Sequence, residues 1–299
     1  FTYRHKVLKH DLEHHVGRTP PKRILISGAS GTIGSILIPF LTTQGHEVVQ
    51  LVRDREQLGD DRRFWDPYQD MIDLDSAERF DAVINLNGLD ISRGRWTDRQ
   101  KTKILDSRLI PTRVLARAIA RLDHRPDVFI SSSAIGFYGD RGDDVLSETD
   151  PVGDCFISRV CDEWESASFE AQKAGIRTVQ LRIGVVLTPA GGALQRMEPA
   201  FKAGCGVRLS HGRQFMSWIS MEDTLSGIWH IINHDGVEGP VNLTAPSPVP
   251  NAEFAQTLGR VVSRPVIFVM PRFVISMLWG EMGRETLLAS ARVQPSKLL

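Results

Sequence analysis

The amino-acid sequence predicts an α/β protein in which a doubly wound parallel sheet is joined to a smaller C-terminal α+β lobe. Two observations predict this class. Between Lys22 and Leu187, short β-branched runs alternate with long helical patterns, which is typical of consecutive β-α-β units. After Leu187 this alternation gives way to glycines, prolines and irregular spacing, so we expect a different arrangement there.

The elements follow in order along the chain. Strands of the sheet are expected at 23–27, 46–52, 81–86, 127–132 and 177–186, with helices at 33–43, 97–121 and 155–174. The breaker cluster at 188–193 then begins an irregular stretch that lasts to Ser220. Ser220 and Asp223 have the spacing of a capping box, which opens a helix to about residue 234. A strand is expected at 241–244, followed by a helix at 251–262 capped by Asn251 and a strand at 266–270 in the lobe.

These elements suggest three parts. We expect residues 1–20 to be a linker or the tail of an upstream domain, because this polar stretch ends abruptly at Thr19 and two prolines. His10 and His14 lie one helical turn apart and could hold a metal ion, but a solvated helix face is favoured because no third ligand is evident. Residues 21–190, together with 220–245, are expected to form the nucleotide-binding domain, and residues 191–219 and 246–299 the substrate lobe.

The composition is that of an ordinary globular protein and argues against several classes. The chain has 299 residues, and its 36 basic and 36 acidic side chains give no electrostatic case for nucleic acid or an anionic membrane. Three cysteines are too few for a disulfide framework, and no apolar run is long enough to span a bilayer. We therefore expect a cytoplasmic protein whose partner is a small molecule, with no nucleic acid, membrane or metal.

The turn after the first expected strand has the pattern of a dinucleotide site. Gly28 allows a tight turn, Gly31 lets a phosphate approach the backbone, and Gly34 lets the following helix pack on the strand. Because the three glycines stand between a strand and a helix at the start of a β-α-β series, they predict a Rossmann-type domain. The expected cofactor contacts in this turn are Gly28, Ser30, Gly31, Thr32, Ile33 and Gly34.

The G-x-x-G-x-x-G spacing and several further motifs resemble a known family. In order, these are Trp-Asp-Pro at 65–67, Asn-Leu-Asn-Gly at 85–88, Arg-Trp at 95–96, Ser-Arg at 107–108, Ser-Ser-Ser-Ala at 131–134, Gly-Phe-Tyr-Gly at 136–139, Trp-Glu at 164–165, Arg-Ile-Gly-Val-Val at 182–186 and Ala-Pro at 245–246. From about residue 22 to 299, the chain resembles the nucleoside-diphosphate-sugar-epimerase-like, cell-division-inhibitor-like branch of the atypical extended short-chain dehydrogenases/reductases. Members of that branch often carry a small lipid-binding-type domain upstream.

The end of the second expected strand favours NADP(H). NAD-specific sites place an Asp or Glu there to bind the ribose hydroxyls, whereas the counted position here is Arg53, whose guanidinium suits a 2′-phosphate. Asp54 is an alternative ribose acceptor if the register shifts by one, and a solvated Arg53 is the simpler reading. The resemblance implies further cofactor contacts from Asn87, Gly88, Ser131 and Arg182. For Asn87, a buried turn asparagine is the alternative.

The catalytic pair of the resembled family is absent. Extended short-chain dehydrogenases act through Tyr-x-x-x-Lys on one helix, but none of Tyr3, Tyr68 and Tyr138 is followed by such a lysine. Ile157 and Cys161 stand where that pair is expected. Ser133 and Tyr138 are the hydroxyls that remain, and we expect them to be catalytic if there is turnover. Alternatively, Tyr138 is a residue that lines the wall of the substrate site. Cys161 is either a thiol that acts as an acid or simply a small buried residue.

Residues 191–218 are expected to form a substrate lid hinged at Gly191 and Gly192. Arg213 and Trp218 are its expected substrate contacts, because the arginine suits an anionic ligand; a solvated loop is the alternative. The sequence thus predicts an NADP(H)-binding, epimerase-like oxidoreductase that acts on a nucleotide sugar or another small carbonyl compound. The alternative is a non-catalytic regulatory protein that senses NADP(H), while a Rossmann-like methyltransferase is disfavoured by the glycine spacing and by Arg53.

Overall fold

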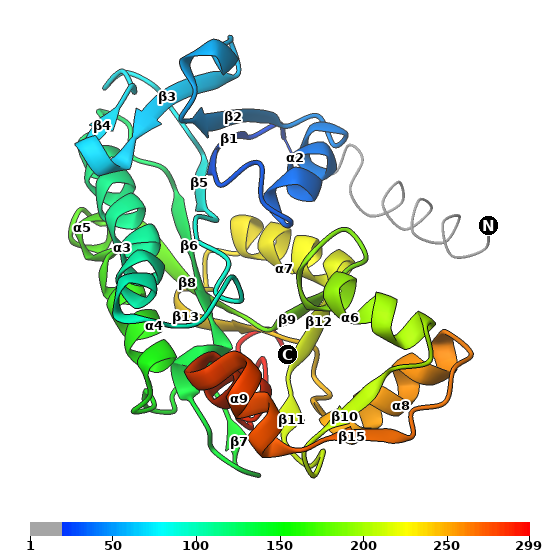
Figure 1. Ribbon diagram of the computed structural model, residues 1–299. Coiled ribbons are helices and arrows are strands. Elements are labelled where there is room, and N and C mark those ends of the chain that lie inside the picture. Colours follow the sequence, from blue (N-terminus) through cyan, green and yellow to red (C-terminus); the bar gives the residue numbers. More distant parts are fainter. Residues whose placement is uncertain (1–19) are drawn as a thin grey trace.

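The computed structural model describes residues 20–299, and its centre is an eight-stranded sheet with helices on both faces (Figure 1). The strand order is β13-β8-β6-β5-β1-β2-β3-β4, and every neighbouring pair is parallel except β3 with β4. The predicted α/β class is confirmed. The strands of this sheet are β1 (Arg23–Ser27), β2 (Glu47–Val52), β3 (Arg62–Asp66), β4 (Met71–Ile72), β5 (Ala82–Asn85), β6 (Val128–Ala134), β8 (Arg177–Ile183) and β13 (Gly239–Leu243).

Two apolar cores hold the helices on the sheet. Successive residues of a strand point to opposite faces, so Ile24 and Ile26 of β1 lie in one core and Leu25 in the other. Helices α2 and α7 cover the first face, where Leu37 packs, and α3 and α5 cover the second, where Leu115 packs. The long helices of the domain are α2 (Gly34–Thr42), α3 (Asp98–Ala120), α4 (Phe156–Ser166) and α7 (Met221–Asn233), and the short α5 is Phe169–Lys173.

Side chains cap both α3 and α7, and of these two caps only the one at Ser220 is predicted from the sequence. Thr97 caps α3 and accepts the amide of Gln100 at 3.3 Å, while Ser220 caps α7. Asn251 does begin α8 (Asn251–Val261), but the prediction that its side chain caps the helix is wrong. Its Oδ1 instead accepts the amide of Leu209 at 2.9 Å, which ties α8 to a neighbouring strand. The helix expected at 155–174 is two helices, α4 and α5.

The C-terminal lobe is more regular than the sequence predicts. The stretch expected to be irregular contains α6 (Gly192–Lys202) and three short strands. Strands of two or three residues show no hydrophobic periodicity, so sequence patterns miss them. The paired strands are β10 (Val207–Leu209) with β15 (Phe268–Met270), β11 (Phe215–Met216) with β14 (Val249–Pro250), β12 (Trp218–Ser220) with β9 (Val185–Leu187), and β16 (Arg292–Val293) with β7 (Val145–Leu146). Helix α9 (Arg272–Met282) packs against the sheet domain near α4.

The expectations for residues 1–19, including His10 and His14, lie outside the described residues. Within residues 20–299, no group of three or more His, Cys, Asp or Glu side chains is arranged to hold a metal ion. A search of the same residues finds no helix with the length and apolar character needed to cross a membrane.

Candidate functional site

The predicted site residues gather at the carboxyl edge of the parallel strands, where ligands of open α/β sheets bind. The glycine turn follows β1, Arg53 follows β2, and Gly88 follows β5. Ser133 and Arg182 lie near the ends of β6 and β8 and are register partners. The strand order therefore places residues that are distant in the sequence along one edge.

The glycine turn has the geometry of a phosphate cradle. Gly28 has a φ of +79°, and a Cβ there would lie 2.7 Å from the carbonyl carbon of Leu86. A Cβ on Gly34 would collide with the Gly28 carbonyl oxygen, so packing within the fold explains both glycines. Gly31 is different, because it is exposed and a Cβ would meet only that oxygen, at 3.2 Å. No side chain of the described residues caps α2, which leaves the start of the helix open to an anion.

The lid predicted at 191–218 reaches this turn. Gly191 lies so close to Thr32 that a Cβ would overlap the threonine hydroxyl. From α6, Arg196 pairs with Asp90 and hydrogen-bonds Ser92, in the loop that follows β5. The first part of the C-terminal lobe is thereby fixed at two points beside the candidate cofactor crevice.

Arg53 is well placed for a nucleotide phosphate. It directly follows β2, is exposed, and lies over the Tyr68 ring at 5.8 Å. Asp54 is occupied, because its carboxylate accepts the Glu56 amide at 3.0 Å and starts a short 3₁₀-helix. Arg55 stacks on Phe64 at 3.8 Å. Strand β2 therefore ends at Val52, which puts Arg53 at the predicted position just past the strand. The alternative acceptor Asp54 instead has a local structural role.

Asn87 and Gly88 are placed differently from one another. Asn87 is buried, and its amide donates to Ser27 Oγ at 2.6 Å and to Asn85 Oδ1 at 2.7 Å, which agrees with the alternative of a buried turn asparagine. Gly88 is exposed and stands next to the guanidinium of Arg108, which lies over Trp164 and donates to the Leu89 carbonyl at 3.0 Å. Burial lowers the pKa of Arg108.

A buried polar network connects β6, β8 and β13. Ser133 Oγ donates to Glu165 Oε1 at 2.7 Å, and the same carboxylate accepts two N–H groups of Arg182 at 2.8 and 2.9 Å. Arg182 also donates to the Tyr138 hydroxyl at 2.9 Å, and that hydroxyl donates to Asn242 Oδ1 at 2.7 Å. All five polar groups therefore have partners within the protein.

Burial bears on three of the predicted site residues, Tyr138, Arg182 and Ser131. Tyr138 is 0% exposed, so its phenol cannot meet a substrate, and burial raises its pKa further from neutrality. Arg182 is 3% exposed and is held by Glu165, so its guanidinium is not directed at a cofactor. Ser131 is also buried, and its hydroxyl accepts the Asn85 amide at 3.3 Å. The two arginines and Glu165 that organise this edge lie in motifs of the resembled family, but sequence analysis gave no role to Arg108 or Glu165.

The face of α4 beside Ser133 is apolar where the family has its catalytic pair. Ile157 and Cys161 are both buried one helical turn apart, and both lie near Gly136, which follows β6. Burial raises the pKa of the Cys161 thiol to about 12, so the thiol stays protonated at neutral pH. Of the two catalytic candidates, Ser133 lies beside this face, and its hydroxyl donates a hydrogen bond to the Glu165 carboxylate.

The C-terminal lobe contains arginines that have no carboxylate partner among the described residues. Among the described residues, none of Arg208, Arg213 and Arg292 has an ion pair, and the buried Nε atoms of Arg208 and Arg292 have no hydrogen-bond partner. Arg292 lies over the Phe215 ring at 4.8 Å. Arg213 is exposed, and Trp218 is partly buried at the start of β12, where its carbonyl accepts the Ala245 amide at 2.7 Å.

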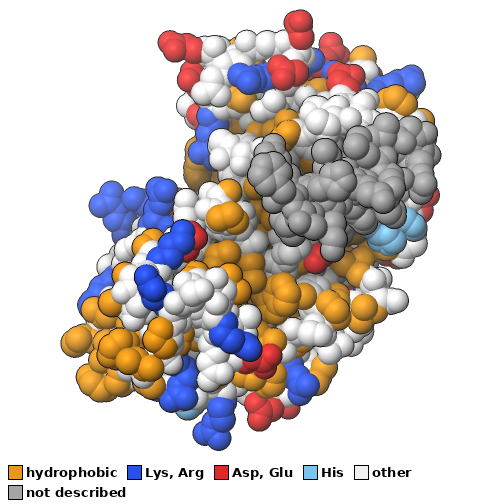
Figure 2. All heavy atoms as spheres, turned by 90° about the vertical axis from the view of Figure 1, so that its right-hand side faces the viewer, with side chains coloured by type: hydrophobic (Ala, Val, Ile, Leu, Met, Phe, Trp, Pro, Cys, Tyr) orange, Lys and Arg blue, Asp and Glu red, His pale blue; other side chains and the backbone are white. Residues whose placement is uncertain are grey.

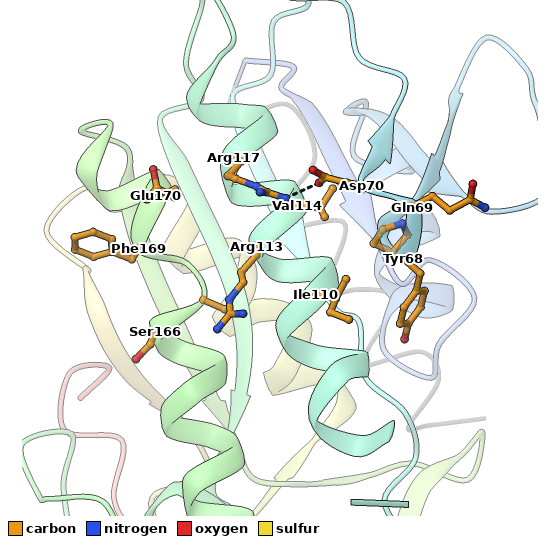
Figure 3. A pocket seen from close by; sticks show the side chains of 12 residues that line it. Tyr68, Gln69, Asp70, Ile110, Arg113, Val114, Arg117, Ser166, Phe169 and Glu170 are labelled. Carbon is orange, nitrogen blue, oxygen red and sulfur yellow. Dashed lines mark hydrogen bonds and ion pairs between the residues drawn. The ribbon is translucent and has the colours of Figure 1, made fainter. Parts of the chain in front are cut away.

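A separate hollow of about 710 Å³ lies on the outer side of α3 (Figure 3). Its walls come from the segment after β3, from α3 and from the α4–α5 junction, and Arg117 in its wall is paired with Asp70. None of the predicted cofactor residues lines it. The hollow is therefore distinct from the candidate cofactor site at the carboxyl edge of the sheet.

Comparisons with known proteins agree with this geometry. The model of the NAD dependent epimerase/dehydratase family matches residues 24–243. An epimerase family protein of Mycobacterium bovis is 42% identical over 275 residues, which cover 92% of this chain and 90% of that protein. The crystal structure of human epimerase family protein SDR39U1 with NADPH has a TM-score of 0.83 at 32% identity and covers 92% of both chains. The nucleoside-diphosphate sugar epimerase of Corynebacterium glutamicum has a TM-score of 0.76 at 32% identity, covering 98% of this chain and 57% of that one.

Proposed function

Because the chain belongs to the NAD dependent epimerase/dehydratase family, we propose that it binds NADP(H) at the carboxyl edge of the sheet and acts as an epimerase-like oxidoreductase. Its substrate would be a nucleotide sugar or another small carbonyl compound. One observation carries the cofactor assignment: Gly31 is an exposed glycine that protein packing does not explain, at the uncapped start of a helix. The NADPH in the related human structure supports the same assignment.

The residues of the turn fit the cofactor. The backbone of residues 28–34 and the start of α2 would hold the pyrophosphate, and Arg53 would bind the 2′-phosphate by a charge-assisted hydrogen bond. The nicotinamide, when bound, supplies or accepts the hydride. The guanidinium groups of Arg208 and Arg292 have no carboxylate partner among the described residues, and their buried Nε atoms have no hydrogen-bond partner, which favours an anionic substrate at the C-terminal lobe.

The proton path that we propose begins at Ser133. Its Oγ donates to Glu165 Oε1, and although the side chain is only 3% exposed, this oxygen would accept the hydroxyl proton of an alcohol substrate. As that proton arrives, Ser133 passes its own proton to the carboxylate. Carbonyl reduction reverses both transfers. Arg182 acts as a positioning residue here, since its two hydrogen bonds fix the carboxylate.

A second candidate function has its own support. With Ile157 and Cys161 buried and apolar and Tyr138 sealed in the interior, the conventional acid and base are missing. A protein that binds NADP(H) but catalyses no reaction would also have this arrangement. Stoichiometric NADPH binding without hydride transfer, across a broad panel of carbonyl compounds, would favour this regulatory function.

Cofactor binding is tested by fluorescence titration with NADPH and NADH. Gly31→Val is expected to abolish NADPH binding in a folded protein, because the branched side chain fills the approach of the phosphate. Arg53→Ala is expected to lower the affinity for NADPH by roughly tenfold to a hundredfold and to leave the affinity for NADH unchanged. Arg55→Ala is the matched control, since that side chain stacks on Phe64. An unchanged ratio of NADPH to NADH affinity in Arg53→Ala would contradict the assignment.

Turnover, where it is found, is tested at Ser133. Ser133→Ala is expected to lower kcat by about 10²-fold or more, as for loss of a proton-transfer group. Tyr138→Phe is expected to leave kcat within about twofold, because the phenol does not reach the substrate. The opposite pattern would restore Tyr138 as the acid and overturn the proposed path.

A further inference from the structure

Large apolar side chains are exposed together on the C-terminal lobe. The exposed fractions are 75% for Val261, 71% for Ile267, 53% for Phe268, 71% for Phe273 and 60% for Met277. We call these five residues the lobe patch. The helices and strands that carry it, α8, β15 and α9, lie in the lower part of Figure 1, and Figure 2 shows orange side chains gathered at the lower left with blue ones around them.

The lobe patch comes from one continuous stretch of chain. Val261 ends α8, Ile267 and Phe268 lie at the start of β15, and Phe273 lies in the first turn of α9. Met277 is four residues further along α9, so it shares a helix face with Phe273. Because more than half of each side chain is exposed, these residues protrude and do not line a groove.

The charge around the lobe patch is of one sign. Residues 254–280 contain Arg260, Arg264 and Arg272 and no Asp or Glu. All three arginines are exposed, and none has an ion-pair partner among the described residues. The whole substrate lobe, residues 191–219 and 246–299, has ten basic and four acidic side chains in a chain of zero net charge. The zero net charge of the whole chain conceals this asymmetry.

From this juxtaposition we propose that the lobe patch docks the protein on an anionic phospholipid surface. Apolar side chains that enter the boundary between headgroups and acyl chains gain burial, while the neighbouring arginines bind lipid phosphates. A fluid lipid surface needs no complementary groove, which suits side chains that protrude. A second copy is disfavoured as the occupant, because two lobes of the same positive charge repel each other.

The experiment is sedimentation of the full chain with vesicles of phosphatidylcholine alone and of phosphatidylcholine mixed with phosphatidylglycerol. We expect binding to the mixed vesicles only, and weaker binding as added salt shortens the screening length. Phe273→Ser is expected to weaken binding by about tenfold, and Arg264→Gln by about fivefold. The matched control is Phe169→Ser, because Phe169 is 59% exposed on α5, outside the lobe.

Three results would overturn the proposal. The first is no binding to the anionic vesicles, including the case in which the protein binds only an acidic peptide such as polyglutamate. The second is equal binding to both vesicle types, or equal loss in Phe273→Ser and Phe169→Ser. The third is a dimer in sedimentation velocity that Phe273→Ser dissociates without any vesicle binding, which would assign the lobe patch to a second copy. NADPH affinity is measured alongside, so that an unfolded variant is recognised.

Discussion

Replacing Glu165 by glutamine tests the buried network directly. The Glu165 carboxylate accepts two N–H groups of Arg182 and the Ser133 hydroxyl, and the side chains of Glu165 and Arg182 are only 12% and 3% exposed. Removing one partner of a buried ion pair costs about 3–5 kcal/mol, because the remaining charge is left without compensation. The glutamine keeps the shape and one acceptor, so we expect a loss near the lower end, about 3 kcal/mol in the free energy of unfolding.

The assay is urea denaturation followed by far-UV circular dichroism. Glu47→Gln is the matched control, because Glu47 pairs with Arg23 at 2.7 Å but is 61% exposed, and such pairs contribute about 0–1 kcal/mol. Adding Arg182→Met to Glu165→Gln is expected to recover part of the loss, since the uncompensated charge is then gone. A loss in Glu165→Gln no larger than that in Glu47→Gln would refute the reasoning.

Three further predictions follow from burial. Tyr138→Phe should lower the free energy of unfolding by about 1–3 kcal/mol, because Asn242 and Arg182 lose a buried partner, while NADPH affinity stays unchanged. With a thiol reagent at neutral pH, exposed Cys205 should react at once and Cys161, whose pKa burial raises to about 12, only after unfolding; equal rates would contradict its burial. Burial lowers the pKa of His46, so its contribution to stability should be present above about pH 6.5 and be lost as the pH falls below it. Unfolding free energies measured at several pH values should fall with decreasing pH below about 6.5 in the wild type, and should fall less in His46→Gln.

The fold could be predicted because its signals are local. The cap at Ser220 depends on a residue three positions away, Asp223, whose amide it accepts as predicted. Asn251 has the same signal, but its side chain is used by the Leu209 amide from a different strand. Nothing near Asn251 in the sequence reveals that competitor. The short strands β10, β11 and β12 were missed for a related reason, since the partners of β10 and β11 lie far along the chain.

The positions of the site residues along the backbone could be predicted from the sequence, but the surroundings of their side chains could be predicted less well. The glycine turn and Arg53 follow directly from strand ends, so counting along the sequence locates them. The environment of Tyr138 depends on Asn242, which lies 104 residues away, and that of Arg182 depends on Glu165 on another element. A hydroxyl or guanidinium in a family motif can therefore be identified from sequence, while its partner cannot.

The buried network also bears on why the usual catalytic pair can be absent without loss of the fold. In the conventional arrangement a lysine would occupy the position of Cys161, within reach of the Arg108 charge that acts on this thiol. Here the cationic group at this edge of the sheet is Arg182, which comes from β8 and is compensated by Glu165 from α4. A lysine added at Cys161 would enter a buried region that already holds two guanidinium groups and one carboxylate, so its charge would lack a partner. The proposed proton path therefore uses the Ser133 hydroxyl and the Glu165 carboxylate, and leaves the more deeply buried Tyr138 phenol and Cys161 thiol in structural roles.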